Sequence, residues 1–309
     1  MRLLVADVEE HAGGGRRRVT VVDRALEITR LGDGFHSAGL LKPDAASRTA
    51  AAVERYVRRA GTLGAPSPVV AATYALRAAR NPDLLLGLLP MPVRMLTGDE
   101  EAALGFRGAI GGLAGLDRGA PVLVLDVGGG SVELTWGTAE RGIEDSRSLP
   151  VGCVVMTQRF IAHDPPQPDE IAALEGTLAA AVDPALAALG RDFSPRPRLV
   201  GVGGTVTTLA AMAQRLVPYD PDRVHGFAVA AADVERLLED MRVLPLAARR
   251  CVPGLQPERA DVIVAGTLVV RYVIASLGDA VITASETDLL WALVAGFSAS
   301  AAPGGTDCR

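Results

Sequence analysis

The residues best suited to chemistry lie where an apolar stretch ends in a carboxylate followed by glycines. In PVLVLDVGGGSVELTWG, residues 121–137, a strand of Val and Leu reaches Asp126, and a glycine run separates it from a second strand. Glycine leaves the backbone N–H groups of such a turn uncovered, and a concavity of this kind suits a phosphate. We therefore predict a phosphate loop formed by Gly128, Gly129, Gly130 and Ser131.

A carboxylate beside a phosphate implies a cation between them. Asp126 would repel a bound polyanion unless a hard divalent ion were present, and the usual ion is Mg²⁺ held through waters, or Mn²⁺. Glu133 lies in the next strand on the same face as Ser131, so it could reach the same ion. The alternative is that Gly-Gly-Gly-Ser is only a tight hairpin turn, with Asp126 as its turn residue.

A second glycine cluster occurs after the apolar residues 198–202. It consists of Gly201, Gly203, Gly204 and Thr205. This cluster opens a helix whose free N–H groups could hold another phosphate or a nucleotide. A helix N-cap packed closely on its strand is the alternative. Neither cluster keeps the G-x-G-x-x-G spacing of dinucleotide-binding proteins, and no Gly-Lys-Ser/Thr sequence occurs, so we set those two kinds of nucleotide site aside.

The elements that position these loops alternate between strands and helices. Two hairpin-linked strands at 1–8 and 18–30 are followed by helices and strands in turn, and a similar pattern begins again at residue 121. We therefore predict an α/β protein that contains one architectural unit twice, with the link in the glycine-rich stretch 111–120. The predicted divisions are residues 1–115, residues 116–299 and a frayed tail, residues 300–309.

Composition limits the classes of function. The chain has 309 residues, of which 49% are hydrophobic, and this is enough for two domains with cores. Its 31 basic and 36 acidic residues form no basic run, so neither nucleic acid nor a membrane surface is expected as a partner. The three cysteines and four histidines show no metal-ligand spacing. With no signal-like start and no long apolar run, we expect a cytoplasmic protein.

Several motifs together resemble the Ppx/GppA family of exopolyphosphatases and guanosine pentaphosphate phosphohydrolases. They occur in family order over most of the chain: ATYALRAARN (72–81), TGDEEAALGFRGA (97–109), LVLDVGGGSVEL (123–134), SLPVGCVVMTQRF (148–160), GVGGTVTTLAA (201–211) and VPGLQPERADVIVAG (252–266). The resemblance implies two actin-like, ribonuclease H-like α/β domains with a cleft between them. The length is similar to that of the short family members that have only these two domains.

The resemblance also implies roles for single residues. Glu101 matches the general base that orients and deprotonates the attacking water, and Arg77 matches a phosphate contact. Asp126 and Glu133 match the metal-linked carboxylates. The loop Gly203–Thr205 matches the phosphate loop on the other side of the cleft. Without the resemblance, the acidic residues 99–101 would be read as a helix N-terminus favoured by the helix dipole, and Arg77 as a surface arginine.

The sequence departs from the family at its start. The family's first phosphate motif, Asp-x-Gly-Thr/Ser-Asn-Ser-x-Arg, is represented here only by Arg2, which matches the terminal Arg. We therefore expect the first domain to lack its usual first strand, which is central in the related fold. We also expect the true start of the protein to lie upstream of Met1. A smaller departure is Leu290, at a position that often holds Arg.

The leading hypothesis is a metal-dependent exopolyphosphatase that hydrolyses the terminal phosphoanhydride of inorganic polyphosphate. Phosphoanhydride hydrolysis needs neutralised oxygens and a positioned water more than a covalent nucleophile, and the residues above supply both. Hydrolysis of pppGpp at its 5′-phosphate is the first alternative. A non-catalytic protein that binds an alarmone or polyphosphate is the second, should the truncated start be real. A homodimer is implied by the resemblance only.

Overall fold

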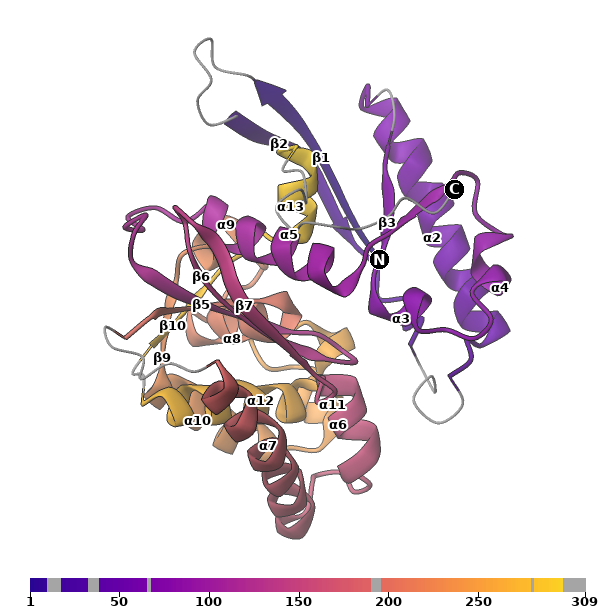
Figure 1. Cartoon of the computed structure of the whole chain (residues 1–309). Coiled ribbons are helices and arrows are strands. Elements are labelled where there is room, and N and C mark those ends of the chain that lie inside the picture. Colours follow the sequence, from indigo (N-terminus) through magenta and orange to yellow (C-terminus); the bar gives the residue numbers. More distant parts are fainter. Residues whose placement is uncertain (10–17, 33–38, 66–67, 190–195, 279–280, 297–309) are drawn as a thin grey trace. The chain divides into compact units, whose positions relative to one another are not determined.

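The chain folds into two compact units (Figure 1). The computed structural model describes residues 1–9, 18–32, 39–65, 68–189, 196–278 and 281–296. The first unit consists of residues 1–108 and the chain from Leu289 on, and the second unit consists of residues 109–288. The chain therefore leaves the first unit once and returns to it once.

A six-stranded sheet with the order β7-β6-β5-β8-β10-β9 forms the centre of the second unit. Its strands are β5 (Pro121–Val127), β6 (Val132–Thr138), β7 (Gly142–Leu149), β8 (Arg198–Val202), β9 (Ala228–Ala230) and β10 (Val281–Ala284). β5 pairs antiparallel with β6 and parallel with β8. Its Val and Leu residues are buried almost without interruption, as expected of a strand covered on both faces. The apolar stretch of the sequence is thus an inner strand, with Asp126 near its carboxyl end.

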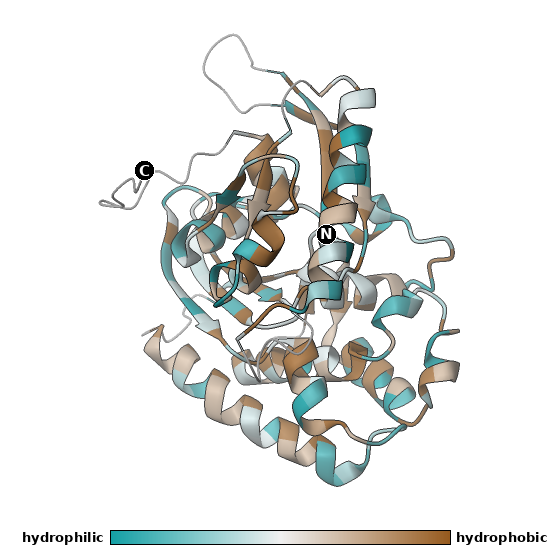
Figure 2. Ribbon diagram, turned by 90° about the vertical axis from the view of Figure 1, so that its right-hand side faces the viewer, coloured by the Kyte–Doolittle hydropathy of each residue, from teal (hydrophilic) through white to brown (hydrophobic). Residues whose placement is uncertain are grey.

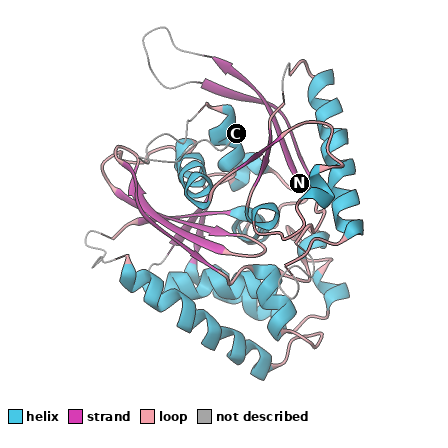
Figure 3. Cartoon of the chain, turned by 45° about the vertical axis from the view of Figure 1, so that its right-hand side comes forward, coloured by secondary structure: helices cyan, strands magenta, loops and turns pink. Residues whose placement is uncertain are grey.

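Helices cover this sheet. They are α6 (Cys153–Phe160), α7 (Pro168–Ala188), α8 (Gly203–Ala213), α9 (Pro221–Val224), α10 (Ala231–Arg242), α11 (Leu246–Arg249) and α12 (Ile263–Leu277), with a 3₁₀ turn η1 (Pro257–Arg259). α7, α10 and α12 lie on one face of the sheet (Figures 1 and 3). α12 contacts α6, α7, α8 and α10, and ten of its 15 residues are buried. A helix that is apolar nearly all round is the centre of a core.

Among the residues that the structure describes, one helix, α7, is long and apolar enough to cross a membrane by length and composition alone. Leu174, Leu178 and Val182 are fully buried and belong to the core of the second unit. Their spacing of four residues places them on one face of the helix. Because that face packs against the core, we describe α7 as a core helix.

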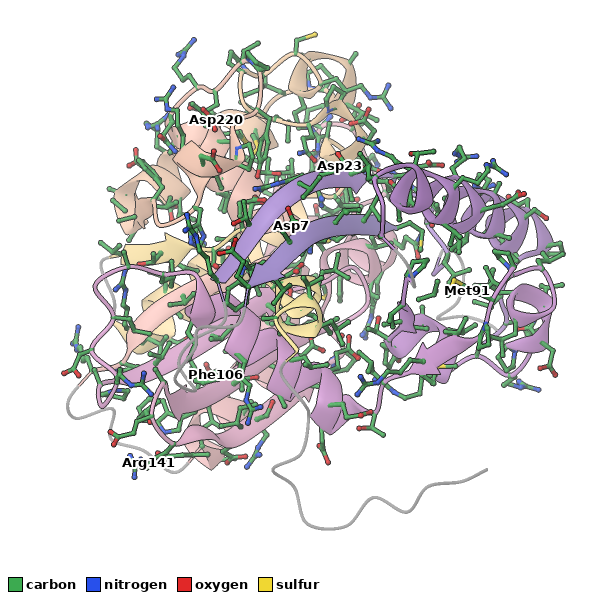
Figure 4. All side chains as sticks on the ribbon, turned by 90° about the horizontal axis from the view of Figure 1, so that it is seen from above. Asp7, Asp23, Met91, Phe106, Arg141 and Asp220 are labelled. Atoms are coloured by element: carbon green, nitrogen blue, oxygen red, sulfur yellow. The ribbon has the colours of Figure 1, made fainter. Side chains whose placement is uncertain are left out.

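In its described part, the first unit holds two separate sheets of two strands each. They consist of β1 (Arg2–Glu9) with β2 (Arg18–Leu26), and of β3 (Val70–Ala72) with β4 (Val93–Met95). The first pair is antiparallel and carries Asp7 and Asp23, which Figure 4 labels, and the second pair is parallel. Within the described residues no ladder joins β1 to β3.

The helices of the first unit are α2 (Pro43–Thr62), α3 (Tyr74–Arg77), α4 (Asp83–Leu86), α5 (Gly98–Gly111) and α13 (Leu289–Val294). α2 is amphipathic, with small buried residues on one side and hydrophilic turns on the other (Figure 2). Arg59 on α2 donates to Asp23 of β2 over 2.7 Å, and Arg55 donates to Glu27 over 2.6 Å. α2 is therefore tied to the β1–β2 pair by charge.

The bounds of the compact units differ from those predicted from sequence. The division falls between Gly108 and Ala109, within the last turns of α5, where the sequence pattern suggested residue 115. α13 was expected in the second domain, but it belongs to the first unit. There Leu289 and Leu293 pack against Leu96 and Leu104. The return of the chain depends on contacts that are distant in sequence, which local patterns do not show.

Candidate active site

The two predicted metal carboxylates are direct neighbours in the sheet of the second unit. Asp126 on β5 lies opposite Glu133 on β6 in the antiparallel register. Residues that are opposite in such a pair carry their side chains on the same face, with Cβ atoms about 5 Å apart. Both residues are half-buried, and the Ser148 hydroxyl donates to Glu133 Oε1 over 2.9 Å. The sheet therefore presents two carboxylates side by side at one edge.

The loop from Gly128 to Ser131 is a tight hairpin turn closed by a hydrogen bond from Gly128 N–H to the Ser131 carbonyl, at 3.0 Å. Its carbonyls face α6, because the N–H groups of Cys153 and Val154 donate to Gly128 and Gly129 at 3.0 Å each. Among the described residues, the N–H groups of Gly129, Gly130 and Ser131 donate to no backbone carbonyl. The segment can therefore be a tight hairpin turn and a phosphate loop at the same time. The turn points its carbonyls away from these N–H groups, so the carbonyls would not repel a phosphate bound there.

Gly152, which precedes α6, holds this loop in place. A Cβ atom at Gly152 would lie 2.5 Å from the backbone of Gly129 and Gly130, so no side chain fits there. Packing between backbones this close requires glycine, which is the physical reason for the Val-Gly-Cys sequence after β7. This contact was not foreseen from the sequence.

The second glycine loop lies against the end of β5. Gly203 has φ +84°, and a Cβ atom there would lie 2.8 Å from Asp126 Oδ1. Asp126 also pairs with Val202 across the parallel ladder of β5 and β8. α8 begins at Gly203, and its N-cap residue makes no side-chain hydrogen bond to the first turn. The uncapped helix start, with Gly204 and Thr205, thus lies next to the carboxylate, in the same unit as the first glycine loop.

Arg259 adds a positive charge to this loop. A Cβ atom at Gly204 would lie 1.8 Å from a terminal nitrogen of Arg259, so the guanidinium group rests directly on the glycine. Arg259 Nε donates to Gln256 Oε1 over 2.9 Å. The sequence reading assigned Arg259 no role, although it lies within the motif VPGLQPERADVIVAG. A single arginine in a turn distant in sequence gives no local signal of its position.

In the first unit, Glu101 and Arg77 form an ion pair. Arg77 ends α3, Glu101 lies in the first turn of α5, and Arg77 NH1 donates to Glu101 Oε2 over 3.1 Å. The same nitrogen donates to the Leu96 carbonyl. About a quarter of each side chain is exposed, 29% for Arg77 and 24% for Glu101. Arg77 is therefore not a free surface arginine, since it holds the carboxylate that was predicted to be the base.

The neighbouring Glu100 has a different environment. Its carboxylate accepts from Thr97 N–H over 2.9 Å, while Thr97 Oγ1 accepts from Glu100 N–H over 3.1 Å, which is a capping box. The hydrogen bond from Thr97 N–H is the largest cause that lowers the pKa of Glu100, and a hydrogen bond from Arg94 lowers it further. The helix-start reading of this acidic run is thus correct for Glu100. Glu101 is turned instead toward Arg77.

Arg2 and two further residues, Cys153 and Trp136, have plainer surroundings. Arg2 is exposed at the start of β1, opposite Leu26 in the ladder, so its role in binding phosphate stays a prediction. Cys153 is buried, and burial raises the pKa of its thiol, in keeping with a packing role. Trp136 is buried within the core of the second unit.

The carboxylate pair fits a Mg²⁺ ion better than an ion held wholly by protein. Within the described ranges no group of three or more His, Cys, Asp or Glu side chains is placed to hold a metal. Mg²⁺ usually binds through one or two carboxylates, with waters and substrate phosphates completing its shell. Asp126 and Glu133 match that donor set in number and in chemistry.

Two glycine loops at the ends of adjacent parallel strands, beside paired carboxylates, define an α/β protein that handles phosphate. The model of the Ppx/GppA phosphatase family matches residues 4–291. The chain therefore belongs to the Ppx/GppA phosphatase family.

Individual relatives agree with this assignment. Exopolyphosphatase 2 of Mycobacterium tuberculosis is 34% identical over 303 residues, which cover 94% of this chain and 92% of the relative. The bifunctional 3-dehydroquinate synthase/phosphatase of Fusobacterium nucleatum is 28% identical and is covered over 44% of its length. The predicted family and enzyme class, a phosphoanhydride hydrolase, are confirmed.

Solved structures confirm the fold class. The Ppx/GppA family member of Aquifex aeolicus aligns with a TM-score of 0.77 at 25% identity, covering 96% of this chain and 92% of that one. An exopolyphosphatase from Cytophaga hutchinsonii aligns with a TM-score of 0.81 at 21% identity over 97% of this chain and 100% of that one, and shows the fold alone. The predicted actin-like α/β fold is thus correct.

Proposed function

We propose that this chain is an exopolyphosphatase that hydrolyses the terminal phosphoanhydride bond of inorganic polyphosphate. The observation that carries the proposal is the placement of Asp126 between Glu133 and the Gly203 loop, at the end of β5. The name of the Mycobacterium tuberculosis relative supports the choice of substrate.

The residues of the second unit would bind the phosphate chain. The N–H groups of the loop Gly128–Ser131 and of the α8 start donate to phosphate oxygens, and Arg259 adds a full charge at the second loop. A divalent ion bound by Asp126 and Glu133 would neutralise charge on the same oxygens. Binding a polyanion requires the N–H groups, the arginine and the divalent ion together, because the carboxylates alone would repel the phosphates.

Glu101 would act as the general base. Arg77 holds Glu101 Oε2 by the ion pair, and we assign the water to the other oxygen, Oε1. As the water oxygen bonds to the terminal phosphorus, its proton passes to Glu101, and the bond from that phosphorus to the bridging oxygen breaks. The products are inorganic phosphate and a chain one phosphate shorter, and Glu101 then returns its proton to solvent.

The test is release of inorganic phosphate from polyphosphate and from pppGpp, each with and without Mg²⁺. We expect faster turnover of polyphosphate, abolished by a chelator, and a raised Mg²⁺ requirement in Asp126→Asn and Glu133→Gln. If pppGpp is preferred in a competition assay, pppGpp replaces polyphosphate as the proposed substrate. If either compound binds tightly and no phosphate is released, the proposed function changes from hydrolysis to binding.

A further inference from the structure

His225 joins two segments of the second unit, one near the point where the chain enters this unit and one near the point where it leaves. It follows α9, and its ring Nε2 lies 2.9 Å from the carbonyl oxygen of Gly112, just after α5. Its Nδ1 lies 3.2 Å from the backbone nitrogen of Glu286, shortly before the chain leaves the second unit. A single ring therefore bridges the segment that enters the second unit and the segment that leaves it.

The two contacts define the proton arrangement of the ring. A carbonyl oxygen can only accept, so Nε2 must carry a hydrogen toward Gly112. The Glu286 N–H can only donate, so Nδ1 must be the bare acceptor. Both bonds can form only when His225 is neutral and protonated at Nε2.

Ser285 makes a second bridge at the same place. The residue is 1% exposed, and its hydroxyl lies 2.9 Å from the Ala109 carbonyl and 3.0 Å from Thr287 Oγ1. Its backbone N–H donates to the Gly201 carbonyl over 2.8 Å, at the end of the strand that precedes the second glycine loop. The last turn of α5 is thus tied, through Ser285, to the strand that carries the phosphate loop.

Gly112 is required for this packing. A Cβ atom at Gly112 would lie 2.7 Å from Thr287 Oγ1 and 3.0 Å from His225 Nε2. A side chain there would push away both residues that hold the helix end. We call His225, Ser285 and Thr287, with Ala109 and Gly112, the α5 clamp.

The clamp acts on the helix that carries Glu101. α5 is a continuous helix from Gly98 to Gly111, with Glu101 in its first turn and Ala109 in its last. Eight residues of helix make a lever of about 12 Å, so a tilt of roughly 10° at the clamp moves the Glu101 end by about 2 Å. A misplacement of about 1 Å can cost on the order of 100-fold in rate.

We propose that His225, in its neutral Nε2–H form, is a positioning residue for phosphate release, acting through α5 on Glu101. The inference rests on the proposed function of Glu101 as the base. His225 is not among the residues assigned to bind substrate or metal. It holds the residue that follows the last turn of the helix on which the base is carried.

The experiment compares three substitutions that keep different parts of the clamp. His225→Gln can still donate to Gly112, His225→Asn can still accept from Glu286, and His225→Ala can do neither. Phosphate release from polyphosphate would be measured with kcat and KM determined separately. His163→Gln, at an exposed histidine elsewhere in the second unit, is the matched control. Gly112→Ala disturbs the same clamp from the opposite side.

We expect kcat to fall about 10- to 100-fold in His225→Ala, with KM nearly unchanged, because binding groups are untouched. His225→Gln should recover part of kcat, and Gly112→Ala combined with His225→Ala should lose little more than either alone. Thermal unfolding of each variant shows that it is folded. ¹⁵N NMR of labelled histidine in the wild type should show a proton on Nε2 and none on Nδ1.

The outcomes separate the two proposals. A wild type that releases phosphate, with kcat unchanged in folded His225→Ala, overturns the positioning role alone. A proton on Nδ1 in the wild type does the same, since the bond from Glu286 could not form. A wild type with the expected tautomer that releases no phosphate from polyphosphate or pppGpp overturns the proposed function, and the catalytic purpose of the clamp with it.

Discussion

At the scale of single residues, the acidic run at the start of α5 divides its tasks between neighbours. Glu100 closes a capping box with Thr97, whereas Glu101 pairs with Arg77. Helix geometry explains the division, because side chains one position apart point about 100° away from each other around the axis. Two adjacent glutamates can therefore serve helix start and chemistry without competing.

This division gives a matched pair of variants. Glu101→Gln keeps the shape but removes the proton acceptor, so kcat for phosphate release should fall by about 10²- to 10⁴-fold with the unfolding midpoint nearly unchanged. Glu100→Gln should keep kcat and lose about 0.3 to 1 kcal/mol of stability, because a charge at the helix N-terminus is lost. Steady-state kinetics and thermal unfolding of both proteins measure these effects. Equal kcat values in the two variants would contradict the assignment of Glu101 as the base.

Arg259 is the second residue whose substitution is informative. Arg259→Ala should lower kcat/KM for polyphosphate by roughly 10- to 100-fold, because a charged hydrogen bond contributes about 1.5 to 3 kcal/mol. Arg259→Lys should recover part of the loss, since it restores charge without the planar fork. Arg250→Ala, at an exposed arginine elsewhere in the second unit, controls for the change in net charge. An Arg259→Ala protein with wild-type kcat/KM would remove Arg259 from the binding site.

At the scale of elements, the first glycine loop depends on the turn that precedes α6. Gly152→Ala would force a Cβ atom to within 2.5 Å of the loop backbone. We expect a loss of about 1 to 3 kcal/mol in stability and a raised KM for polyphosphate, because the loop must shift. Gly176→Ala in α7, where a Cβ atom meets nothing within 4 Å, should instead gain about 0.5 to 1 kcal/mol. Urea unfolding of the two variants measures both changes, and equal effects would contradict the packing argument.

The start of α7 makes stability depend on pH. Glu170 accepts from the N–H groups of Gln167 and Ala162 over 2.8 Å each and pairs with the His163 ring, and these bonds lower its pKa to about 2. In the unfolded chain a glutamate titrates near about 4.3. The folded state therefore gains stability above pH about 4.3 and loses that gain as the pH falls toward 2.

Glu170→Gln should remove this part of the acid sensitivity. The difference in urea midpoint between wild type and variant should be largest above pH 5 and should shrink as the pH approaches 2. His163→Ala should reduce the acid sensitivity only in part, because the largest contribution to the lowered pKa of Glu170 is the hydrogen bond from the Gln167 backbone. A difference that does not change between pH 5 and pH 2 would refute the assignment.

At the scale of the whole molecule, local pattern predicted several elements that carry the candidate site residues. The apolar run of β5 and the hairpin after it place Asp126 opposite Glu133, because register follows from a short turn. The start of α8 at Gly203 was also readable from the glycines and the apolar stretch before them. What these features share is that each depends on residues close in sequence.

The sequence analysis did not predict features that depend on residues far apart in the sequence. The position of Arg259 on Gly204, the place of Gly152 under the first loop and the bridges of His225 arise only when separate elements pack. The return of α13 to the first unit is of the same kind. Hydrophobic periodicity describes which face of an element is buried, but it does not say which partner covers that face.

The two small sheets of the first unit bear on how the protein opens locally. The sheet of the second unit has six strands over one large apolar core, whereas each sheet of the first unit has two strands. Two-stranded pairs are only marginally stable by themselves, and regions with few buried contacts open at a smaller free-energy cost. Amide hydrogens of β1 to β4 should therefore exchange with deuterium well before those of β5, β6 and β8, and limited proteolysis should begin in the first unit.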